Sequence, residues 1–544
     1  MGDLGFNAFI SIFVSADEMQ SDQNIIKFTQ TELVLDSREL YLEERNSTVL
    51  KYLENLYREV HEALGAHATT AAQDAKDVVD FQIQLAKATE PKEKMMDRIN
   101  QLHRMTLANM TARFPQFDWL RYVQRQFSQM GLSYNINLEE VVVNDALVYY
   151  TNLFKLVNQT SVRTLLNYGM WRFVHKFLDF LDPRLDKVRV IVSDTDSQSS
   201  ERWKTCVKIT ELSFPYAVGR LYVDKKFSPN DKRRTEHMFE KLTVAFKEML
   251  LEVTWMTQRT MEKALKKLNN LGNKIGYPDL ILNDTALNAK SEMYIVEENN
   301  FFGNNLEITK KFRLSMLQKL RKPVDVTEWP LSPSTVNAFH SYQTNEIVFP
   351  AGVLSPPFYS RKLSDALMFG SIGFIIGHEI THGFDISGST FDEKGNLNLW
   401  WTEEDFKIFQ NRTQCLVNQF SQFVDKELNM HVNGWLTLHE NIADNGGVKE
   451  AFRAYRSVIK ERGREEDKYP SLPYTQDQLF FIGLAQVLCG KFSPSSRKLY
   501  LLSDSYSPDN FRVIGTLQNS EDFERVFKCP VGSPMNPRHK CQVW

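Results

Sequence analysis

The sequence lacks a surplus of charge of either sign. Its 65 lysines and arginines nearly balance 68 aspartates and glutamates, which leaves a formal net charge of −3 over 544 residues. A protein that binds nucleic acid along its surface usually carries a strong positive field. We therefore expect no nucleic-acid partner. The share of hydrophobic residues, 42%, is that of an ordinary globular protein.

Long hydrophobic runs are also missing. No segment reaches the roughly 20 apolar residues that a membrane-spanning helix needs, so we expect no membrane span in this chain. The apolar start, MGDLGFNAFISIFV, has no cationic residues ahead of it and no clear cleavage site. We expect it to form a strand of the fold, and we expect no signal peptide.

Cysteine is scarce and odd in number, so a complete disulfide framework is excluded. Taken alone, the five cysteines are typical of a cytosolic protein with scattered thiols. Five N-x-[ST] sequons favour secretion only weakly, because about four would arise by chance. The cysteines are Cys206, Cys415, Cys489, Cys529 and Cys541, and the sequons begin at Asn46, Asn109, Asn158, Asn283 and Asn411.

Helical periodicity dominates the first half of the chain, and there is no internal repeat. Apolar residues recur every three or four positions, which is typical of helices that bury one face. Around residues 325–360 the texture changes to Pro- and Ser-rich segments and a strand-like run, NEIVFPAGVL (345–354). The predicted helices cover 49–64, 161–181, ended by Asp182 and Pro183, and about 230–270.

Residues 367–385, LMFGSIGFIIGHEITHGFD, contain a motif for metal chemistry. An apolar helix runs into His-Glu-x-x-His, and His378 and His382 project from one helix face, close enough to share an ion. Glu379 follows the first histidine directly, so its carboxylate can reach a water beside the ion rather than the ion itself. A catalytic zinc also needs a third protein ligand and an open fourth position.

Two classes of metallopeptidase place the third ligand differently. One would need glycine at 385 and histidine at 388, where this chain has Asp385 and Gly388. The other takes a glutamate from a later helix, and HENIADNGG (439–447) supplies it. Glu440 can ligate, while Asp444, one turn further on the same face, can accept a proton from a ligand imidazole. By chance alone, the first motif arises in about one such chain in a hundred.

Together, HEITHGFD and ENIADNGG resemble the neprilysin family of zinc metallopeptidases. The resemblance covers nearly the whole chain, through AVGRLYV, VNAF, NEIVFPAGVL, NFRVIGTLQNS and KCQVW. It implies a mainly α (α+β) fold of two lobes, a thermolysin-like zincin catalytic lobe and a large helical lobe around a peptide chamber. We predict a mainly helical domain at 1–280, a connecting segment at 281–335 and the metallopeptidase domain at 336–544.

The resemblance implies one Zn²⁺ per chain, held by His378, His382 and Glu440. Glu379 would act as the general base, taking the proton of the attacking water and passing it to the leaving amine, and Asp444 corresponds to a further catalytic aspartate. The implied reaction is hydrolysis of short peptides on the amino side of large hydrophobic residues. The oligomeric state is not predicted.

The same resemblance assigns substrate contacts. Asn337 and Ala338 would hydrogen-bond the substrate backbone, and Arg512 would grip a substrate carbonyl. The family's transition-state histidine is replaced by Tyr506, whose phenol can either donate to the oxyanion or block the site. Loss of one oxyanion donor typically costs about 10²–10³ in turnover. His439 stands where the family commonly has glycine, and we expect it to be exposed.

Three functions therefore remain open. The first is an active zinc metalloendopeptidase. The second is a catalytically impaired, zinc-binding family member that binds peptides without cleaving them, which Tyr506 favours. The third is a helical scaffold in which the motif arose by chance, and such a protein would bind no zinc.

The resemblance also bears on location. Family members are single-pass membrane-anchored, so it implies the extracellular face of the plasma membrane or secretion. We expect that this chain is N-terminally truncated, without the family's tail, membrane helix and first ectodomain segment. Cys415 and Cys541 would then pair with each other. The other three cysteines, Cys206, Cys489 and Cys529, would match family cysteines whose partners lie in the absent segment.

Overall fold

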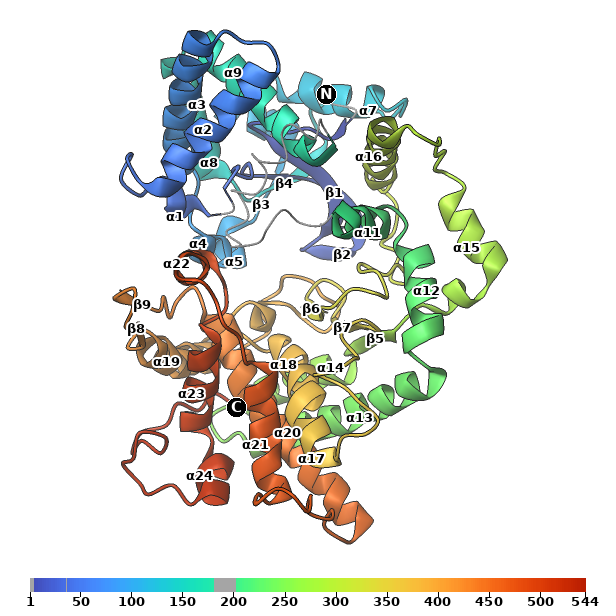
Figure 1. Cartoon of the computed structure of the whole chain (residues 1–544), viewed down its shortest axis with the longest axis vertical. Helices are drawn as coiled ribbons and strands as arrows, with labels where there is room; N and C mark the ends of the chain where they lie inside the picture. The colour runs from blue at the N-terminus through green and yellow to red at the C-terminus, as the bar shows by residue number, and fades with distance from the viewer. Residues whose placement is uncertain (1–3, 36, 181–201) are drawn as a thin grey trace. The chain divides into compact units, whose positions relative to one another are not determined.

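The computed structural model describes residues 4–35, 37–180 and 202–544. Helices dominate the fold and strands are few (Figure 1). The chain forms two compact units. The first consists of Met1–Cys206 with Ser291–Val324, and the second consists of Val207–Lys290 with Asp325–Trp544. Helix α11 (Arg202–Ser213) carries the chain from the first set of residues to the second.

The boundaries of these two units differ from those of the predicted domains, 1–280, 281–335 and 336–544. The chain returns to the first unit because helix α16 (Phe301–Leu317) packs against strand β1 (Ser11–Asp17). Arg313 Nη1 donates a hydrogen bond to the carbonyl oxygen of Ile12 at 3.0 Å. Part of the predicted connecting segment therefore belongs to the core of the first unit, and the three-part division stays a prediction about domains.

A four-stranded sheet organises the first unit. Strand β2 (Gln20–Thr29) pairs antiparallel with β1 and parallel with β4 (Val141–Asn144), and β3 (His103–Thr106) pairs antiparallel with β4. The predicted N-terminal strand thus begins at Ser11. The helices are α1 (Arg38–Tyr41), α2 (Thr48–Ala63), α3 (Ala68–Ala88), α4 (Lys92–Met95), α5 (Arg98–Gln101), α6 (Leu107–Arg113), α7 (Trp119–Ser128), α8 (Leu147–Gln159), α9 (Val162–Lys176), α16 and the 3₁₀ turn η2 (Leu178–Phe180).

Two helices of this unit test the helix bounds that were predicted from the apolar periodicity. The helix predicted at 49–64 is α2, which packs on α3 through its buried leucines and is capped by Ser47. The helix predicted at 161–181 is α9, which ends earlier, at Lys176. Its predicted stop, Asp182 and Pro183, lies outside the described residues.

In the second unit, the helical region predicted at about 230–270 is two helices, α13 (Pro229–Glu252) and α14 (Gln258–Asn269). The buried Asp405 holds the break between them: its carboxylate accepts hydrogen bonds from Thr257 N at 3.1 Å and from Thr257 Oγ1 at 2.6 Å. Asp405 lies 148 residues further along the chain, so local periodicity could not reveal the interruption.

A three-stranded sheet lies beside the helices of the second unit. Strand β7 (Glu346–Pro350), which was predicted within 345–354, pairs parallel with β5 (Gly272–Gly276) and antiparallel with β6 (Phe339–Ser341). The remaining elements are α12 (Pro215–Lys226), η4 (Asp279–Leu282), α15 (Asp284–Ser291), α17 (Asp365–Met368), η5 (Phe369–Gly373), α18 (Phe374–His382), η6 (Gly388–Thr390), α19 (Glu403–Phe420), β8 (Val424–Asp425), β9 (Met430–His431), α20 (Leu438–Arg462), α21 (Gln476–Val487), α22 (Pro494–Ser503), α23 (Asp509–Asn519) and α24 (Glu521–Phe527).

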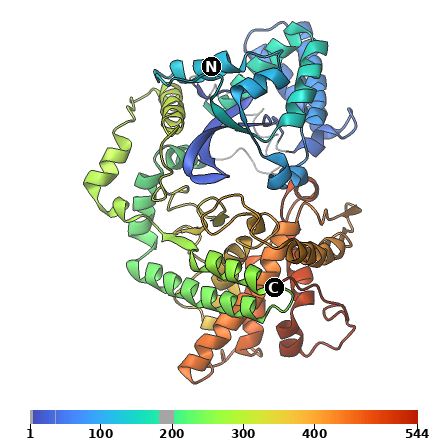
Figure 2. The same cartoon turned by 180° about the vertical axis from the view of Figure 1, so that it is seen from behind.

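Helices α18 and α20 form the centre of this unit and lie side by side (Figure 1). Glycines allow their close approach: a Cβ at Gly447 would lie 2.7 Å from the backbone nitrogen of His378, and one at Gly377 would lie 3.0 Å from the carbonyl oxygen of Gly447. Seen from behind, α13 runs alongside α20 (Figure 2). The apolar helix predicted at 367–385 is α17, the π-helical turn η5 and α18 in succession.

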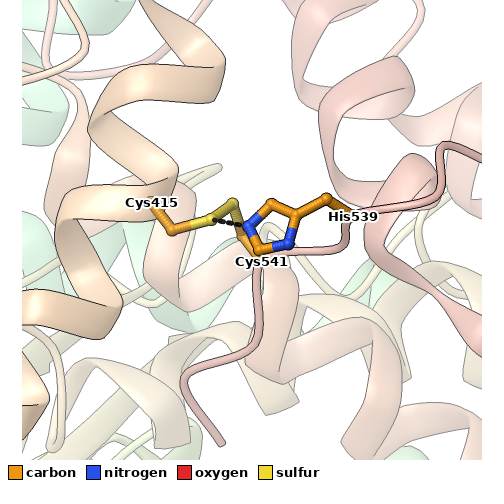
Figure 3. A group of neighbouring side chains, drawn as sticks. All are labelled: Cys415, His539 and Cys541. Atoms are coloured by element: carbon orange, nitrogen blue, oxygen red, sulfur yellow. Dashed lines mark hydrogen bonds between the residues drawn. A yellow bond between two sulfur atoms is a disulfide. The ribbon is translucent and has the colours of Figure 1, made fainter.

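A disulfide joins Cys415 of α19 to Cys541 near the carboxyl end (Figure 3). This pairing was implied by the family resemblance and is confirmed. The other three cysteines form no disulfide within the described part of the chain. Beyond Cys541, the Trp544 ring packs against Phe246 and Phe384. No helix among the described residues is long and apolar enough to cross a membrane.

Candidate metal centre

Three buried side chains meet where α18 and α20 pack together. His378 Nε2 lies 3.0 Å from Oε2 of Glu440, and His382 Nε2 lies 3.3 Å from the same oxygen. The two Nε2 atoms are 3.0 Å apart. The structure therefore brings the three predicted ligands together, two from one helix and one from the first turn of the other.

The second helix also holds the ring of His378. Asp444 Oδ1 lies 2.8 Å from His378 Nδ1, so that Nδ1–H donates to the carboxylate and Nε2 is left as an acceptor. Arg512 donates to the same carboxylate, from Nε to Oδ2 at 2.8 Å and from Nη2 to Oδ1 at 2.7 Å. Burial opposes ionisation of Asp444, but the Arg512 charge and these hydrogen bonds lower its pKa.

The ring of His382 is held by a carboxylate that lies three residues later in the sequence. Asp385 Oδ2 lies 2.6 Å from His382 Nδ1, and Tyr342 donates its hydroxyl to that oxygen at 3.1 Å. Asp385 Oδ1 accepts from the backbone nitrogens of Ser387 at 2.7 Å and Gly388 at 2.6 Å. Both imidazoles thus present Nε2 to Glu440 because a carboxylate takes each Nδ1–H.

A buried lysine braces the loop that carries Asp385. Lys267 Nζ donates to the carbonyl oxygens of Gly388 at 2.6 Å and Phe391 at 2.7 Å. Only 2% of this residue is exposed, and burial lowers the pKa of Lys267 to about 7. The charges of Asp385 and Asp392 partly oppose that shift.

Glu379 lies between the two histidines in sequence and is 5% exposed. Burial raises the pKa of its carboxyl above the ordinary value. The carboxylate makes no hydrogen bond with any described residue, while its backbone carbonyl lies 3.0 Å from Nδ1 of His340. An unbonded carboxylate beside the cluster is free to exchange a proton with a water or a substrate.

Tyr506 and Arg512 pack together beside His378. The Tyr506 ring lies 6.4 Å from the His378 ring at an interplanar angle of 17°, and the Arg512 guanidinium carbon lies 4.5 Å from the Tyr506 centroid. Burial, with the charges of Glu440 and Glu379, raises the pKa of Tyr506, so the phenol stays protonated. Two nitrogens of Arg512 are already bound to Asp444, which leaves Nη1 for another partner.

Asn337 and Ala338 directly precede β6, which packs against α18. The exposed Asn337 side chain accepts a hydrogen bond from Ala338 N at 2.8 Å. Its Nδ2 group donates to no residue that the structure describes. The pair therefore lies at the edge of the small sheet and retains hydrogen-bonding capacity.

His439 corrects an expectation, because it is 8% exposed and not a surface residue. Its Nε2 lies 3.2 Å from Oε1 of Glu440, and its ring centroid lies 6.0 Å from that of His382. The prediction failed because the start of α20, where His439 lies, is buried.

With this geometry established, comparison with known proteins identifies the family. Two models described as peptidase family M13 match the chain, the N-terminal one over residues 1–278 and the other over residues 337–543. The chain is 37% identical over 543 residues to endothelin-converting enzyme 1 of Mus musculus and to that of Homo sapiens, and each alignment covers 98% of this chain and 70% of the relative. The chain belongs to peptidase family M13. Membership confirms the predicted resemblance to the neprilysin family and makes the chain a zinc metalloendopeptidase by class.

Solved structures show the same M13 fold. Zinc metalloprotease Zmp1 of Mycobacterium tuberculosis, in complex with an inhibitor, is 28% identical, with a TM-score of 0.89 over 100% of this chain and 81% of that chain. PepO of Lactobacillus rhamnosis shares the fold at 23% identity, with a TM-score of 0.82 over 100% of this chain and 82% of that chain. The predicted mainly helical, two-part fold is confirmed.

The three side chains of this M13 centre fit the zinc ion that the family implies. Two nitrogens and one oxygen are a donor set that zinc prefers, and tetrahedral bonds of about 2.0–2.1 Å place ligand atoms about 3.3 Å apart. The observed separations are 3.0–3.3 Å. Glu440 Oε2 is buried and makes no hydrogen bond with the described residues, so an ion would satisfy it. A second cluster, Cys415, His539 and Cys541, offers no thiolates because its sulfurs are joined (Figure 3).

Sequence reasoning missed three supporting residues of the M13 centre. Asp385 had a signal, because it lies three residues after His382 and its carboxylate can reach back to that ring. Tyr342 and Lys267 gave no signal, because each is far in the sequence from the residue it bonds. Tyr342 bonds Asp385, and Lys267 bonds the carbonyl of Gly388.

Proposed function

We propose that this chain hydrolyses short peptides on the amino side of large hydrophobic residues, with Glu379 as the general base. Family membership supplies the class of reaction. The observation that carries the finer proposal is the unbonded, buried Glu379 carboxylate beside three converging ligand atoms. His378, His382 and Glu440 would hold one zinc ion, which when bound acidifies water and polarises a carbonyl.

In the proposed mechanism, this chain's own residues position the reactants and move one proton. Asp444 and Asp385 keep both ligand imidazoles in the tautomer that offers Nε2. Glu379 accepts a proton from the attacking water and delivers it to the leaving amine. Its raised pKa suits both steps, because a carboxyl closer to neutrality in pKa is a stronger base and still returns the proton.

The substrate contacts are proposed from the same arrangement. Asn337 Nδ2 and the backbone of Ala338 would bond the peptide backbone at the edge of the sheet. The remaining nitrogen of Arg512, Nη1, would donate to a substrate carbonyl, and the Tyr506 hydroxyl would add a second donor to the oxyanion.

One observation favours a second candidate, an impaired member that binds peptides without cleaving them. The Tyr506 ring lies against the Arg512 guanidinium and near the His378 ring. A bulky ring fixed there would occupy space beside the reacting centre. The two candidates differ in turnover and agree in zinc content.

The first experiment measures cleavage of a fluorogenic peptide by the zinc-loaded parent, Glu379→Gln and Glu450→Gln. Glu450 is a matched control, because it is also a fully buried glutamate of the α18–α20 pair and bonds none of the proposed site residues. We expect Glu379→Gln to abolish turnover and Glu450→Gln to retain it. Turnover that persists in Glu379→Gln would refute the assigned base.

The second experiment separates the two candidates with Tyr506→His and Tyr506→Phe. If the phenol donates to the oxyanion, Tyr506→Phe loses about 10²–10³ in kcat. A silent parent that Tyr506→His activates would establish the impaired form. Peptides that vary only in the residue after the scissile bond test the apolar preference, which fails if charged residues are cleaved equally well.

We also propose an extracellular location. The Cys415–Cys541 disulfide supports it, because disulfides persist mainly in oxidising compartments. Secretion assays with the natural gene product check this directly: recovery only from the cytosol would contradict it.

A further inference from the structure

The Glu440 carboxylate has two oxygens with different surroundings. Oε2 faces both ligand imidazoles, at 3.0 Å and 3.3 Å from their Nε2 atoms. Oε1 faces the third histidine of the cluster, with His439 Nε2 3.2 Å away. A carboxylate that was free to rotate could present either oxygen, or both, to an ion. The contact with His439 distinguishes the two oxygens.

Consecutive residues of a helix normally diverge by about 100° and do not face each other. His439 and Glu440 nevertheless approach within hydrogen-bonding distance at the first turn of α20. His439 is 8% exposed, and its other ring nitrogen, Nδ1, is buried without a hydrogen bond to any described residue. The only polar contact that the described structure gives this ring is therefore the Glu440 carboxylate.

The position of His439 also excludes a role as a fourth ligand in this geometry. The ligand atoms that converge within 4.8 Å of one another come from His378, His382 and Glu440 alone. His439 meets the carboxylate from the opposite oxygen. A fourth protein ligand would also close the position that a catalytic zinc keeps open.

We propose that His439 is a positioning residue for the metal centre: its Nε2–H donates to Glu440 Oε1 and so directs Oε2 alone toward the two imidazoles. This inference rests on the proposed zinc site. The bond fixes the carboxylate as a one-oxygen ligand, already aimed at the point where both imidazole nitrogens converge. Outer hydrogen bonds of this kind typically change metal affinity by about 10–100-fold.

The test compares three variants at the same position. His439→Leu keeps a branched apolar volume and removes the donor, and His439→Met does the same with a flexible side chain. His439→Gln places an N–H near the position of Nε2. The readout is zinc affinity, measured by competition with a chromophoric chelator, and the absorption spectrum of the Co²⁺-substituted protein. Circular dichroism and Tm confirm that each variant is folded, and the Met variant replaces the Leu variant if the latter is not.

We expect the Leu and Met variants to lose about 10–100-fold in zinc affinity and to change the Co²⁺ spectrum, and we expect the Gln variant to restore both. Equal affinity in the parent and the Leu or Met variant would overturn the inference. So would a Gln variant that falls as far as these two, because the ring would then act only by filling space. A parent that binds no zinc at all would instead overturn the proposed function beneath it.

Discussion

The two histidines of the candidate metal centre are held in different ways. His382 is supported locally, by an aspartate three residues later whose carboxylate is fixed by backbone N–H groups and one phenol. His378 is supported over a long range, by Asp444 from another helix, 66 residues away, which a buried arginine neutralises. One support depends on a loop, and the other depends on how two helices pack.

This difference shows which contacts of each support are vulnerable to substitution. We call His378 with Asp444 and Arg512 the His378 half. The His382 half is His382 with Asp385, Tyr342 and the loop bonded by Lys267. The His378 half contains a buried ion pair, so removing one charge leaves the other uncompensated. The His382 half contains one carboxylate among backbone and phenol donors, and no arginine bonds it; the buried Lys267 bonds loop carbonyls instead. Four substitutions test the contrast, and their expected effects near neutral pH decrease in the order given.

The largest effect is expected for Asp444→Asn. It leaves the Arg512 guanidinium, which is 9% exposed, without a charge partner, and breaking a buried pair costs about 3–5 kcal/mol in unfolding free energy. Zinc affinity should also fall about 10–100-fold. Denaturant unfolding and chelator competition measure the two. The double variant Asp444→Asn with Arg512→Met should recover stability but not affinity; no recovery would mean that the pair is not the cause.

Gly447→Ala should act first on the His378 half. Its Cβ would lie 2.7 Å from the His378 backbone nitrogen, so α18 and α20 must separate, at a cost of about 1–3 kcal/mol for overpacking. Thermal unfolding and zinc competition measure the result. Gly169→Ala is the matched control, because a Cβ at this other helical glycine meets nothing within 4 Å. Equal effects of the two would refute close helix packing as the determinant.

Asp385→Asn should cost less stability than Asp444→Asn. No arginine loses its partner, and the hydrogen bond left unmade, the one from the His382 ring N–H, costs about 1–3 kcal/mol. Zinc affinity should still fall about 10–100-fold, because His382 loses its orienting carboxylate. Unfolding and chelator titrations of the two asparagine variants, side by side, check this. A larger stability loss in Asp385→Asn would reverse the comparison.

The last effect is a pH dependence that belongs to the His382 half; it is small near pH 7 and grows as the pH rises. Burial lowers the pKa of Lys267 to about 7, from 10.5. Between these values the unfolded chain binds the extra proton, so this lysine makes unfolding free energy rise with pH from about 7 to 10.5 and contributes no slope below 7. We expect Lys267→Met to lack that rise. The measurement is the difference in Tm between parent and variant across this range, and a constant difference would contradict the assignment.

Much of the candidate metal centre was predictable because its residues obey local rules. His378 and His382 are spaced by one helical turn, and so are Glu440 and Asp444. The approach of the two helices was not predictable, because it depends on glycines that read as ordinary small residues in the sequence. The prediction that His439 is exposed failed for the same reason. Its burial depends on what surrounds the start of the helix and not on its neighbours in the sequence.

Two further features of the fold were not predictable for the same reason. The break between α13 and α14 depends on Asp405, and the return of α16 to the first unit depends on contacts with β1. Helical periodicity carries no information about contacts with residues so distant in the sequence. The helix at 49–64 was placed correctly because its apolar face and its cap lie within a few residues of each other.

The packing of the last residue has a practical consequence for anyone who prepares this protein. The main-chain oxygen of Trp544 accepts a hydrogen bond from Lys449 at 3.0 Å. Its indole is 7% exposed and packs against aromatic rings, including Phe384, two residues after His382. An affinity tag appended after Trp544 would lie directly beside this hydrogen bond and the buried indole. Purification handles therefore belong at the amino end.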